Sequence, residues 1–306
     1  MARVTLPVAC AINSDYVLPL LVMLTSLIEH LRPSYQLLLY LVHQAKHEDL
    51  VAIISRLVET HSIVPSPESV EALPQHPHFP PEAAYPLVLP EILPEALDRI
   101  LFLDADLLVL HDLAHLWEIC LGERVLAAAP DAAIPLCSSP RGVKKRRELG
   151  IAEDAVYFNC GVLLIQLDAW RKREVTRRAY GYLQTVGRQV DFLHQEALNA
   201  ILWDDWLPLD SRWNVPGSLA GRSYESPGFN NCPNPGIVHF AGRFKPWRAP
   251  IGGPFYPQYR SFLSRATQWV PVVEPTLRDK LLSIYDRHLR NSLYGCERAL
   301  WNRRLL

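Results

Sequence analysis

Apolar and polar positions along the first sixty residues form blocks that predict strands and helices in turn. The apolar runs at 7–12 and 36–42 (PVACAI and QLLLYLV) are short and nearly uninterrupted, which is typical of buried strands. The segments 16–31 and 46–60 instead carry apolar residues at helical spacing. Strand, helix, strand, helix in this order indicates an α/β domain whose mostly parallel sheet is covered by helices.

Further elements follow up to about residue 254. The nine prolines between Pro65 and Pro94 exclude regular structure across that whole stretch, so we expect only a short, broken helix at 82–93. Strands are predicted at 99–103, 125–129, 157–167 and 237–240, and another helix at 193–202. This main domain, 1–254, is long enough to bury a sizeable core.

From about residue 255 the chain becomes basic, and we expect a separate helical C-terminal appendage at 255–306. Between Arg278 and Arg304 seven lysines and arginines stand against three acidic residues, with Trp301 among them. Such a segment is typical of a peripheral contact with an anionic membrane surface, and equally of an amphipathic helix packed on its own domain. The sequence leaves both interpretations open.

Composition narrows the classes of function. The formal net charge of -1 gives no sign of nucleic-acid binding, and no run of about 18 or more apolar residues predicts a membrane span. The six cysteines include no C-x-x-C pair, and Cys10 and Cys160 lie in apolar, strand-like runs, which indicates buried thiols in a reducing compartment. The N-terminus has no signal-peptide pattern. We therefore expect a cytoplasmic enzyme.

Two carboxylates stand inside the apolar run LFLDADLLVL, 101–110. Asp104 and Asp106 are two residues apart, so in an extended chain they point to the same side and repel each other. A divalent cation would relieve that repulsion, and the carboxyl end of a strand is where open α/β sheets bind ligands. A turn with two solvated aspartates explains the short D-x-D pattern equally well.

A second polar group lies in HFAGRFKPW, 239–247. His239 ends an apolar strand, Gly242 allows close backbone approach, and Lys245 is a suitable cation for a diphosphate. Histidine as a third ligand beside two carboxylates would favour Mn²⁺ over Mg²⁺. A core histidine and a surface lysine are the alternatives for these two residues taken alone.

Two further segments place polar side chains where apolar ones would be expected. In YFNCGVLLIQLDAW, 157–170, Asn159 and Gly161 interrupt a strand, and the Asn159 amide offers a donor and an acceptor to a sugar hydroxyl. A β-bulge is the alternative. In DFLHQEALNAIL, 191–202, His194, Gln195 and Glu196 gather at a helix start, where polar residues are also common without a function.

Together these motifs resemble glycosyltransferase family 8, over residues 4 to 250. The likeness lies in their order along the chain: NSDY (13–16), LFLDAD (101–106), FNCGV (158–162), HQEALN (194–199), LDSRWN (209–214) and HFAGRFKPW (239–247). It implies a GT-A-type, Rossmann-like nucleotide-sugar-binding domain. It also implies a metal-dependent, retaining transferase that moves galactose or glucose from a UDP-sugar to a glycan or lipid-linked acceptor. The expected setting is bacterial surface-polysaccharide or lipopolysaccharide synthesis, either in the cytoplasm or at the inner face of the membrane.

The resemblance also implies roles for single residues. The metal, Mn²⁺ with Mg²⁺ as the alternative, would be held by Asp104, Asp106 and His239. The nucleotide would be bound by Ala11, Asn13, Asp15, Tyr16, Asp104 and Ala105, and its diphosphate by Gly242 and Lys245. The transferred sugar would face Asn159, Gly161, His194 and Gln195, with Gln195 beside the reacting carbon and Glu196 the nearest carboxylate for a nucleophile.

The chain departs from the family pattern at three places. The family often has aspartate where Asn13 stands, Asp-Gln-Asp at 194–196, and an arginine where Pro86 stands. Histidine at 194 would change the choice of donor, and the missing cation would have to come from elsewhere, for example from His78 or Arg243. These departures keep a second hypothesis open, a catalytically silent member that binds a nucleotide or glycan. A third is a haloacid-dehalogenase-type phosphatase, although Leu108 replaces the Thr or Val of that class.

Overall fold

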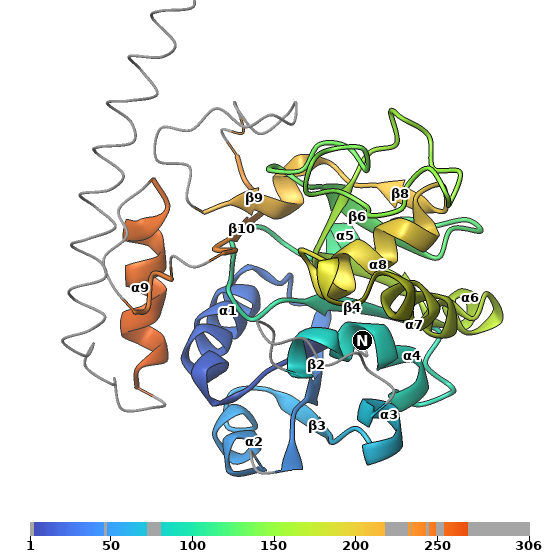
Figure 1. The fold of residues 1–306 in the computed structure, drawn as a ribbon. Coiled ribbons are helices and arrows are strands. Elements are labelled where there is room, and N and C mark those ends of the chain that lie inside the picture. The colour runs from blue at the N-terminus through green and yellow to red at the C-terminus, as the bar shows by residue number, and fades with distance from the viewer. Residues whose placement is uncertain are drawn as a thin grey trace, which may run out of the picture.

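The computed structural model describes residues 3–45, 48–71, 81–217, 232, 234–242, 245–248 and 254–268. Its centre is a seven-stranded sheet in the order β3-β2-β1-β4-β7-β6-β8 (Figure 1). Four of the neighbouring pairs are parallel, and only β7 runs antiparallel to its two neighbours. The strands are β1 (Val4–Ala11), β2 (Tyr35–Val42), β3 (Glu59–Ile63), β4 (Arg99–Leu103), β6 (Leu126–Pro130), β7 (Phe158–Gln166) and β8 (Trp206–Pro208). The expected mostly parallel α/β sheet is confirmed.

A second, three-stranded sheet stands at the carboxyl end of β4. It consists of β5 (Leu107–Val109), β10 (Ile237–His239) and β9 (Val215–Pro216), with β10 in the middle, antiparallel to β5 and parallel to β9. The apolar run 101–110 is therefore two strands in two sheets, because the chain turns at Asp104–Asp106. The register pairs His239 with Leu107, and the Phe240 N–H donates to the Asp106 carbonyl at 3.0 Å.

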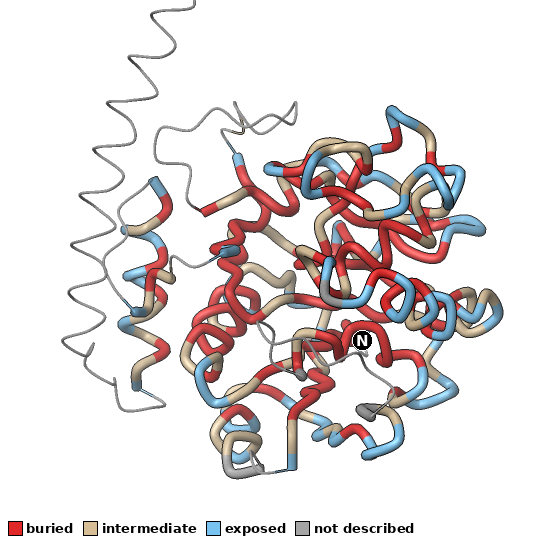
Figure 2. Tube along the Cα trace, in the orientation of Figure 1, coloured by how far each residue is buried: buried red, intermediate tan, exposed pale blue. Residues whose placement is uncertain are grey.

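Helices cover both faces of the large sheet. Alternate residues of β4 point to opposite sides: Leu101 and Leu103 pack in the core that contains α1, and Ile100 and Phe102 in the core that contains α7 and α8. Buried positions follow these elements through the centre of the molecule (Figure 2). The helical segments are η1 (Ser14–Tyr16), α1 (Val17–His30), α2 (Glu48–Ile54), α3 (Pro67–Glu71), η3 (Pro81–Val88), α4 (Leu89–Ile92), α5 (Ala114–Trp117), α6 (Leu167–Lys172), α7 (Val175–Val186), η4 (Gly187–Gln189), α8 (Leu193–Leu202), η5 (Ser211–Asn214) and α9 (Tyr256–Ala266).

One helix prediction was too long. The helical pattern at 46–60 ends at Ile54, because residues 59–63 join the edge of the large sheet as β3. The broken helix expected at 82–93 is present as η3 and α4.

The start of the C-terminal segment packs on the main domain. Helix α9 lies against α1, with Tyr259 and Phe262 buried in the same core. The rest of the appendage, 269–306, lies outside the described residues, so the boundary at 254/255 stays a prediction. Among the helices that the structure describes, none has the length and apolar character needed to cross a bilayer.

Candidate active site

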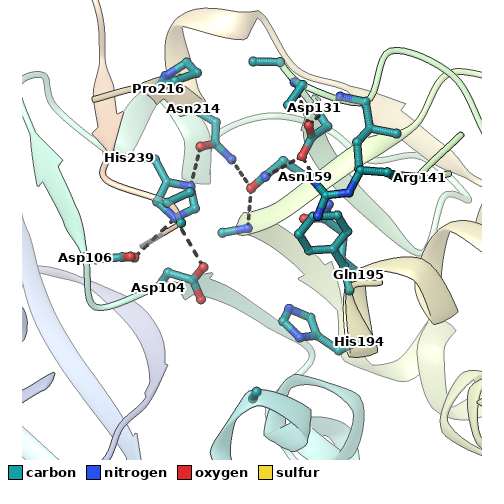
Figure 3. A pocket seen from close by; sticks show the side chains of 18 of the residues that line it. Asp104, Asp106, Asp131, Arg141, Asn159, His194, Gln195, Asn214, Pro216 and His239 are labelled. Atoms are coloured by element: carbon teal, nitrogen blue, oxygen red, sulfur yellow. Dashed lines mark hydrogen bonds and ion pairs between the residues drawn. The ribbon is translucent and has the colours of Figure 1, made fainter. Parts of the chain in front are cut away.

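Asp104, Asp106 and His239 meet where the two sheets join (Figure 3). Asp104 directly follows β4, Asp106 directly precedes β5, and His239 is the last residue of β10. The His239 Nε2 lies 3.5 Å from Asp104 Oδ2 and 3.2 Å from Asp106 Oδ1. One ligand atom from each residue lies within 4.8 Å of the other two. The structure thus brings the three residues of the predicted metal site into one cluster.

Electrostatics in this cluster suit a bound cation. Desolvation raises the pKa of the half-buried Asp104 to about 6, which reflects the difficulty of keeping a second negative charge here. Burial would also raise the pKa of Asp106, but Lys245 and His239 outweigh it and hold that pKa well below its ordinary value. Lys245 binds Asp106 through Nζ and also donates to the Phe240 carbonyl at 2.9 Å. Two carboxylates and one imidazole form a donor set that fits Mn²⁺ or Mg²⁺, with imidazole favouring Mn²⁺.

Gly161 makes room for His239 and Asp104 of the predicted metal site. A Cβ atom there would lie 2.3 Å from His239 Cε1 and 3.0 Å from Asp104 Oδ2, so no side chain fits without moving the imidazole. Gly161, which the family resemblance predicts to face the sugar, is therefore also the residue that lets β7 approach the cluster.

A chain of amide side chains leads away from His239, and one backbone group fixes its direction. The Gly161 N–H donates to Asn159 Oδ1 at 2.8 Å, so that oxygen must face it. Asn214 then donates from Nδ2 to the same oxygen at 2.8 Å, which turns its own Oδ1 toward His239 Nδ1 at 2.9 Å. Nδ1 therefore carries a proton. Nε2 faces the two aspartates, and although burial alone would lower the pKa of His239, Asp106 and Asp104 raise it, so Nε2 is held as a donor to Asp106. A bound cation would take the place of that proton and accept the Nε2 lone pair.

The same chain continues to Gln195 through a buried carboxylate. Asp131 Oδ2 accepts from Asn159 Nδ2 at 2.8 Å and from Gln195 Nε2 at 3.1 Å, and Gln195 Oε1 accepts from the Cys160 N–H at 3.0 Å. Both ends of the Gln195 amide are thus occupied, and its plane is fixed in the wall of the site.

These groups line a cavity of about 580 Å³. Predicted residues in its wall are Asp104, Asp106, Asn159, Gly161, His194, Gln195, His239 and Gly242. Residues that sequence reasoning missed are Asp131, Arg141, Phe192 and Asn214. Asp131 directly follows β6 as Asp104 follows β4, so the same signal, a carboxylate after an apolar strand, was present.

The side chains of His194 and Glu196 lie in different surroundings, although only one residue separates them in the sequence. His194 lines the cavity, and desolvation lowers its pKa to about 4, so it is a neutral side chain there. Glu196 is fully buried outside the cavity wall and accepts from the Tyr182 hydroxyl at 2.6 Å and from the Lys144 and Asp191 N–H groups at 3.0 and 3.1 Å. The expectation of Glu196 as a nearby nucleophile is corrected, because its oxygens hold three protein donors.

Tyr16, one of the predicted nucleotide contacts, lies close to Lys245 and outside the cavity wall, whereas Asp104 and Gly242 are part of that wall. The Lys245 ammonium lies 5.7 Å from the Tyr16 ring centroid and 5.4 Å from that of Trp247. Asn13 Oδ1 accepts from the Asp15 N–H at 3.0 Å, and the Asp15 carboxylate forms an ion pair with Arg248. Their roles toward a nucleotide, and those of Ala11 and Ala105, stay predictions.

The position without the family's arginine does not reach the cavity. Pro86 is buried within η3, and the two suggested substitutes, His78 and Arg243, lie outside the described residues.

Comparisons with known proteins agree with this architecture. A family model described as Glycosyl transferase family 8 matches residues 7–250. General stress protein A of Bacillus subtilis is 31% identical over 215 residues, which cover 65% of this chain and 70% of the relative. Probable galacturonosyltransferase-like 4 of Arabidopsis thaliana is 29% identical over 173 residues, 53% of this chain and 48% of the relative, so the chain matches about half the length of that protein.

Solved structures show the same fold. The galactosyltransferase LgtC, crystallised with donor and acceptor sugar analogs, superposes with a TM-score of 0.72 at 21% identity, over 85% of this chain and 96% of that one. The apo form of the glycosyltransferase GlyE of Streptococcus pneumoniae gives a TM-score of 0.60 at 22% identity, over 88% and 63% of the two chains. The fold is thus of the GT-A type. With a family match that spans most of its length, the chain belongs to glycosyltransferase family 8.

Proposed function

We propose that this glycosyltransferase uses a divalent cation, Mn²⁺ or Mg²⁺, and transfers galactose or glucose from a UDP-sugar with retention at the anomeric carbon. The observation that carries the proposal is the cluster of Asp104, Asp106 and His239 at the edge of a cavity of about 580 Å³. Binding of a nucleotide-sugar requires both features: a cation beside its diphosphate and a pocket with polar walls for its sugar. The crystal structure of LgtC with donor and acceptor sugar analogs supports the same use of this fold.

Within the proposed reaction the chain's own groups have separate tasks. The cation, when bound, supplies positive charge that stabilises the leaving diphosphate. Lys245, whose pKa is raised by Asp106 in spite of burial, remains an ammonium and adds charge at the same place. Gln195 and Asn159, each fixed by two or more hydrogen bonds, present oriented amides to the sugar.

The acceptor is proposed from the family alone. A glycan or lipid-linked acceptor in bacterial surface-polysaccharide or lipopolysaccharide synthesis fits the first hypothesis. Peripheral membrane contact through 278–304 would bring the enzyme to it, and that segment lies outside the described residues. The phosphatase alternative is wrong, because the chain belongs to family 8.

The silent-member alternative makes a different prediction for binding and turnover. Pro86 and His194 motivate it, since each removes a charge that the family uses in the sugar pocket. Such a protein would bind UDP-sugars in a metal-dependent manner but release no UDP. An assay of UDP release, with water or an acceptor taking the sugar, discriminates between the active enzyme and the silent member.

Calorimetry with a panel of UDP-sugars tests the proposal. We expect one UDP-hexose to bind with Mn²⁺ and not with EDTA, and Asp106→Ala to abolish metal-dependent binding. Lys172→Ala is the matched control, because its exposed ion pair with Asp168 lies outside the cavity wall. If wild type binds no UDP-sugar under any metal condition, the proposed function is refuted for this chain.

A further inference from the structure

Arg141 is a cation in the cavity wall that no sequence motif indicated. Figure 3 shows it on the opposite side of the cavity from Asp104, Asp106 and His239, with Asn159 between them. Positive charge at the metal end is supplied by the cation site and Lys245. Arg141 therefore stands at the other end of the cavity. The diphosphate of a donor bound at the metal end would not be its partner.

The backbone that carries Arg141 is held in a tight turn. The Gly142 N–H donates to the Ser139 carbonyl at 2.8 Å, and a Cβ atom at Gly142 would lie 2.4 Å from the Cys137 carbonyl oxygen. The guanidinium carbon lies 4.6 Å from the centroid of the Phe192 ring, which also lines the cavity. Turn and stacking together position the guanidinium before any ligand arrives.

Arg141 forms no ion pair with any residue that the structure describes, whereas three of the four cations that follow it do. The pairs are Lys144 with Asp191 at 2.7 Å, Lys145 with Glu148 at 3.6 Å, and Arg146 with Glu153 at 2.7 Å. The edge of the guanidinium that is not stacked keeps its N–H donors available, since Arg141 is an exposed residue at the cavity.

Asp131 is the carboxylate in the wall beyond the metal cluster, and its oxygens are committed to amides. Oδ1 accepts from the Ala133 and Ile134 N–H groups at 2.8 and 2.9 Å, and Oδ2 accepts from Asn159 and Gln195 at 2.8 and 3.1 Å. Asp131 therefore serves to orient the wall of the cavity.

We propose that Arg141 binds an anionic group, a carboxylate or a phosphate, on a sugar substrate that fills this end of the cavity. The planar fork of a guanidinium matches both groups with two parallel hydrogen bonds. The inference rests on the proposed function and deepens it by naming the substrate class. The anion belongs either to the acceptor, as a sugar phosphate or uronate, or to the donor, in which case the carboxylate is that of a hexuronate that takes the place of the galactose or glucose proposed above.

Three variants isolate this contact: Arg141→Gln, Arg141→Lys and the control Arg147→Gln. Arg147 is exposed on the same segment, lies outside the cavity wall, and loses the same charge on substitution. In the donor arm, calorimetry with Mn²⁺ compares UDP-glucose and UDP-galactose with UDP-glucuronate and UDP-galacturonate. If the donor carries the anion, Arg141→Gln weakens uronate donors about 10- to 100-fold and leaves neutral donors unchanged.

The acceptor arm measures sugar transfer with paired acceptors, glucose against glucose 6-phosphate and glucose against glucuronate. If the acceptor carries the anion, Arg141→Gln raises KM for the charged member of a pair about 10- to 100-fold, and Arg141→Lys restores part of the loss. Donor binding and the neutral acceptor do not change.

The proposal is overturned if Arg141→Gln behaves as Arg147→Gln with every donor and every acceptor pair. That result leaves the proposed function intact, because wild type still binds and transfers a UDP-sugar. If wild type binds no UDP-sugar at all, the proposed function has failed, and the assignment of Arg141 falls with it.

Discussion

Asn214 connects His239, the proposed metal ligand, to the proposed sugar end of the cavity, and its removal gives a sharp test of the site. The amide is 4% exposed, accepts from His239 Nδ1 at 2.9 Å and donates to Asn159 Oδ1 at 2.8 Å. Asn214→Ala leaves a ring N–H without its acceptor and an amide oxygen without one of its two donors. The proton of a neutral imidazole is then no longer held on Nδ1, so Nε2 can offer its lone pair to a cation for only part of the time.

The size of the effect follows from those two contacts. Loss of a group that orients a metal-bound histidine typically lowers metal affinity about 10- to 100-fold, which is about 1.4–2.7 kcal/mol. Leaving buried polar atoms without partners also lowers the free energy of unfolding by about 1–3 kcal/mol. Both effects are large enough to measure separately.

Mn²⁺ titration without nucleotide, followed by electron paramagnetic resonance or calorimetry, measures the first effect, and urea unfolding measures the second. Asn214→Asp is the matched control. Its carboxylate still accepts from His239 but cannot donate to Asn159. We therefore expect metal affinity to be retained and the orientation of the Asn159 side chain to be disturbed. A wild-type Mn²⁺ affinity in Asn214→Ala would refute the reasoning, because the amide would then have no part in orienting the ring.

Three other side chains give outcomes that can be measured directly. Gly161→Ala adds a methyl group 2.3 Å from His239 Cε1, so Mn²⁺ affinity should fall at least about tenfold. The circular dichroism spectrum should not change. An unchanged Mn²⁺ affinity would mean that the imidazole ring has room to move. Desolvation lowers the pKa of His194 in the folded state to about 4 from 6.5, so the unfolded chain binds more protons between these values. The free energy of unfolding should therefore fall as pH drops from 6.5 toward 4, and His194→Gln should remove that part of the slope. Equal slopes in both proteins would contradict a neutral imidazole in the cavity wall. Glu196→Gln sets an amide N–H against donors such as the Tyr182 hydroxyl, so it should lower the free energy of unfolding by about 1–3 kcal/mol while Mn²⁺ affinity is retained, and a lost affinity would return Glu196 to the site.

The hydrophobic pattern predicted the central strands because they are buried on both faces. Strands β1, β2, β4 and β7 read as near-continuous apolar runs. Polar residues after the end of β4 and, because β7 is antiparallel to β4, near the start of β7 mark the edge where the cavity lies. The D-x-D pair and the strand-end histidine became candidates through this signal, since carboxylates and imidazoles are costly in a core unless they have a task or a partner. Only the order of all the motifs along the chain, which resembles family 8, favoured a metal site over a solvated turn and a core histidine.

Features fixed by tertiary contacts left weaker traces. Strand β3 is an edge strand whose sequence, ETHSI, has no buried residue, so the helical pattern before it was extended too far. Strands β4 and β5 looked like one run, because nothing local shows that the chain changes sheets between Asp104 and Asp106. Arg141 stands in a polar turn, and only the fold brings that turn to the cavity.

The predicted metal site takes its members from both sheets, and this couples the sheets in folding. Asp104 directly follows β4 of the large sheet, whereas Asp106 directly precedes β5 and His239 ends β10 of the small one. In the unfolded chain His239 lies far along the sequence from the two aspartates, so an ion that binds all three would act as a reversible cross-link between the sheets. At 100 times its Kd such an ion raises the free energy of unfolding by about 2.7 kcal/mol. The supply of divalent metal would then set how long this protein survives heat and proteases, even when no sugar is being transferred.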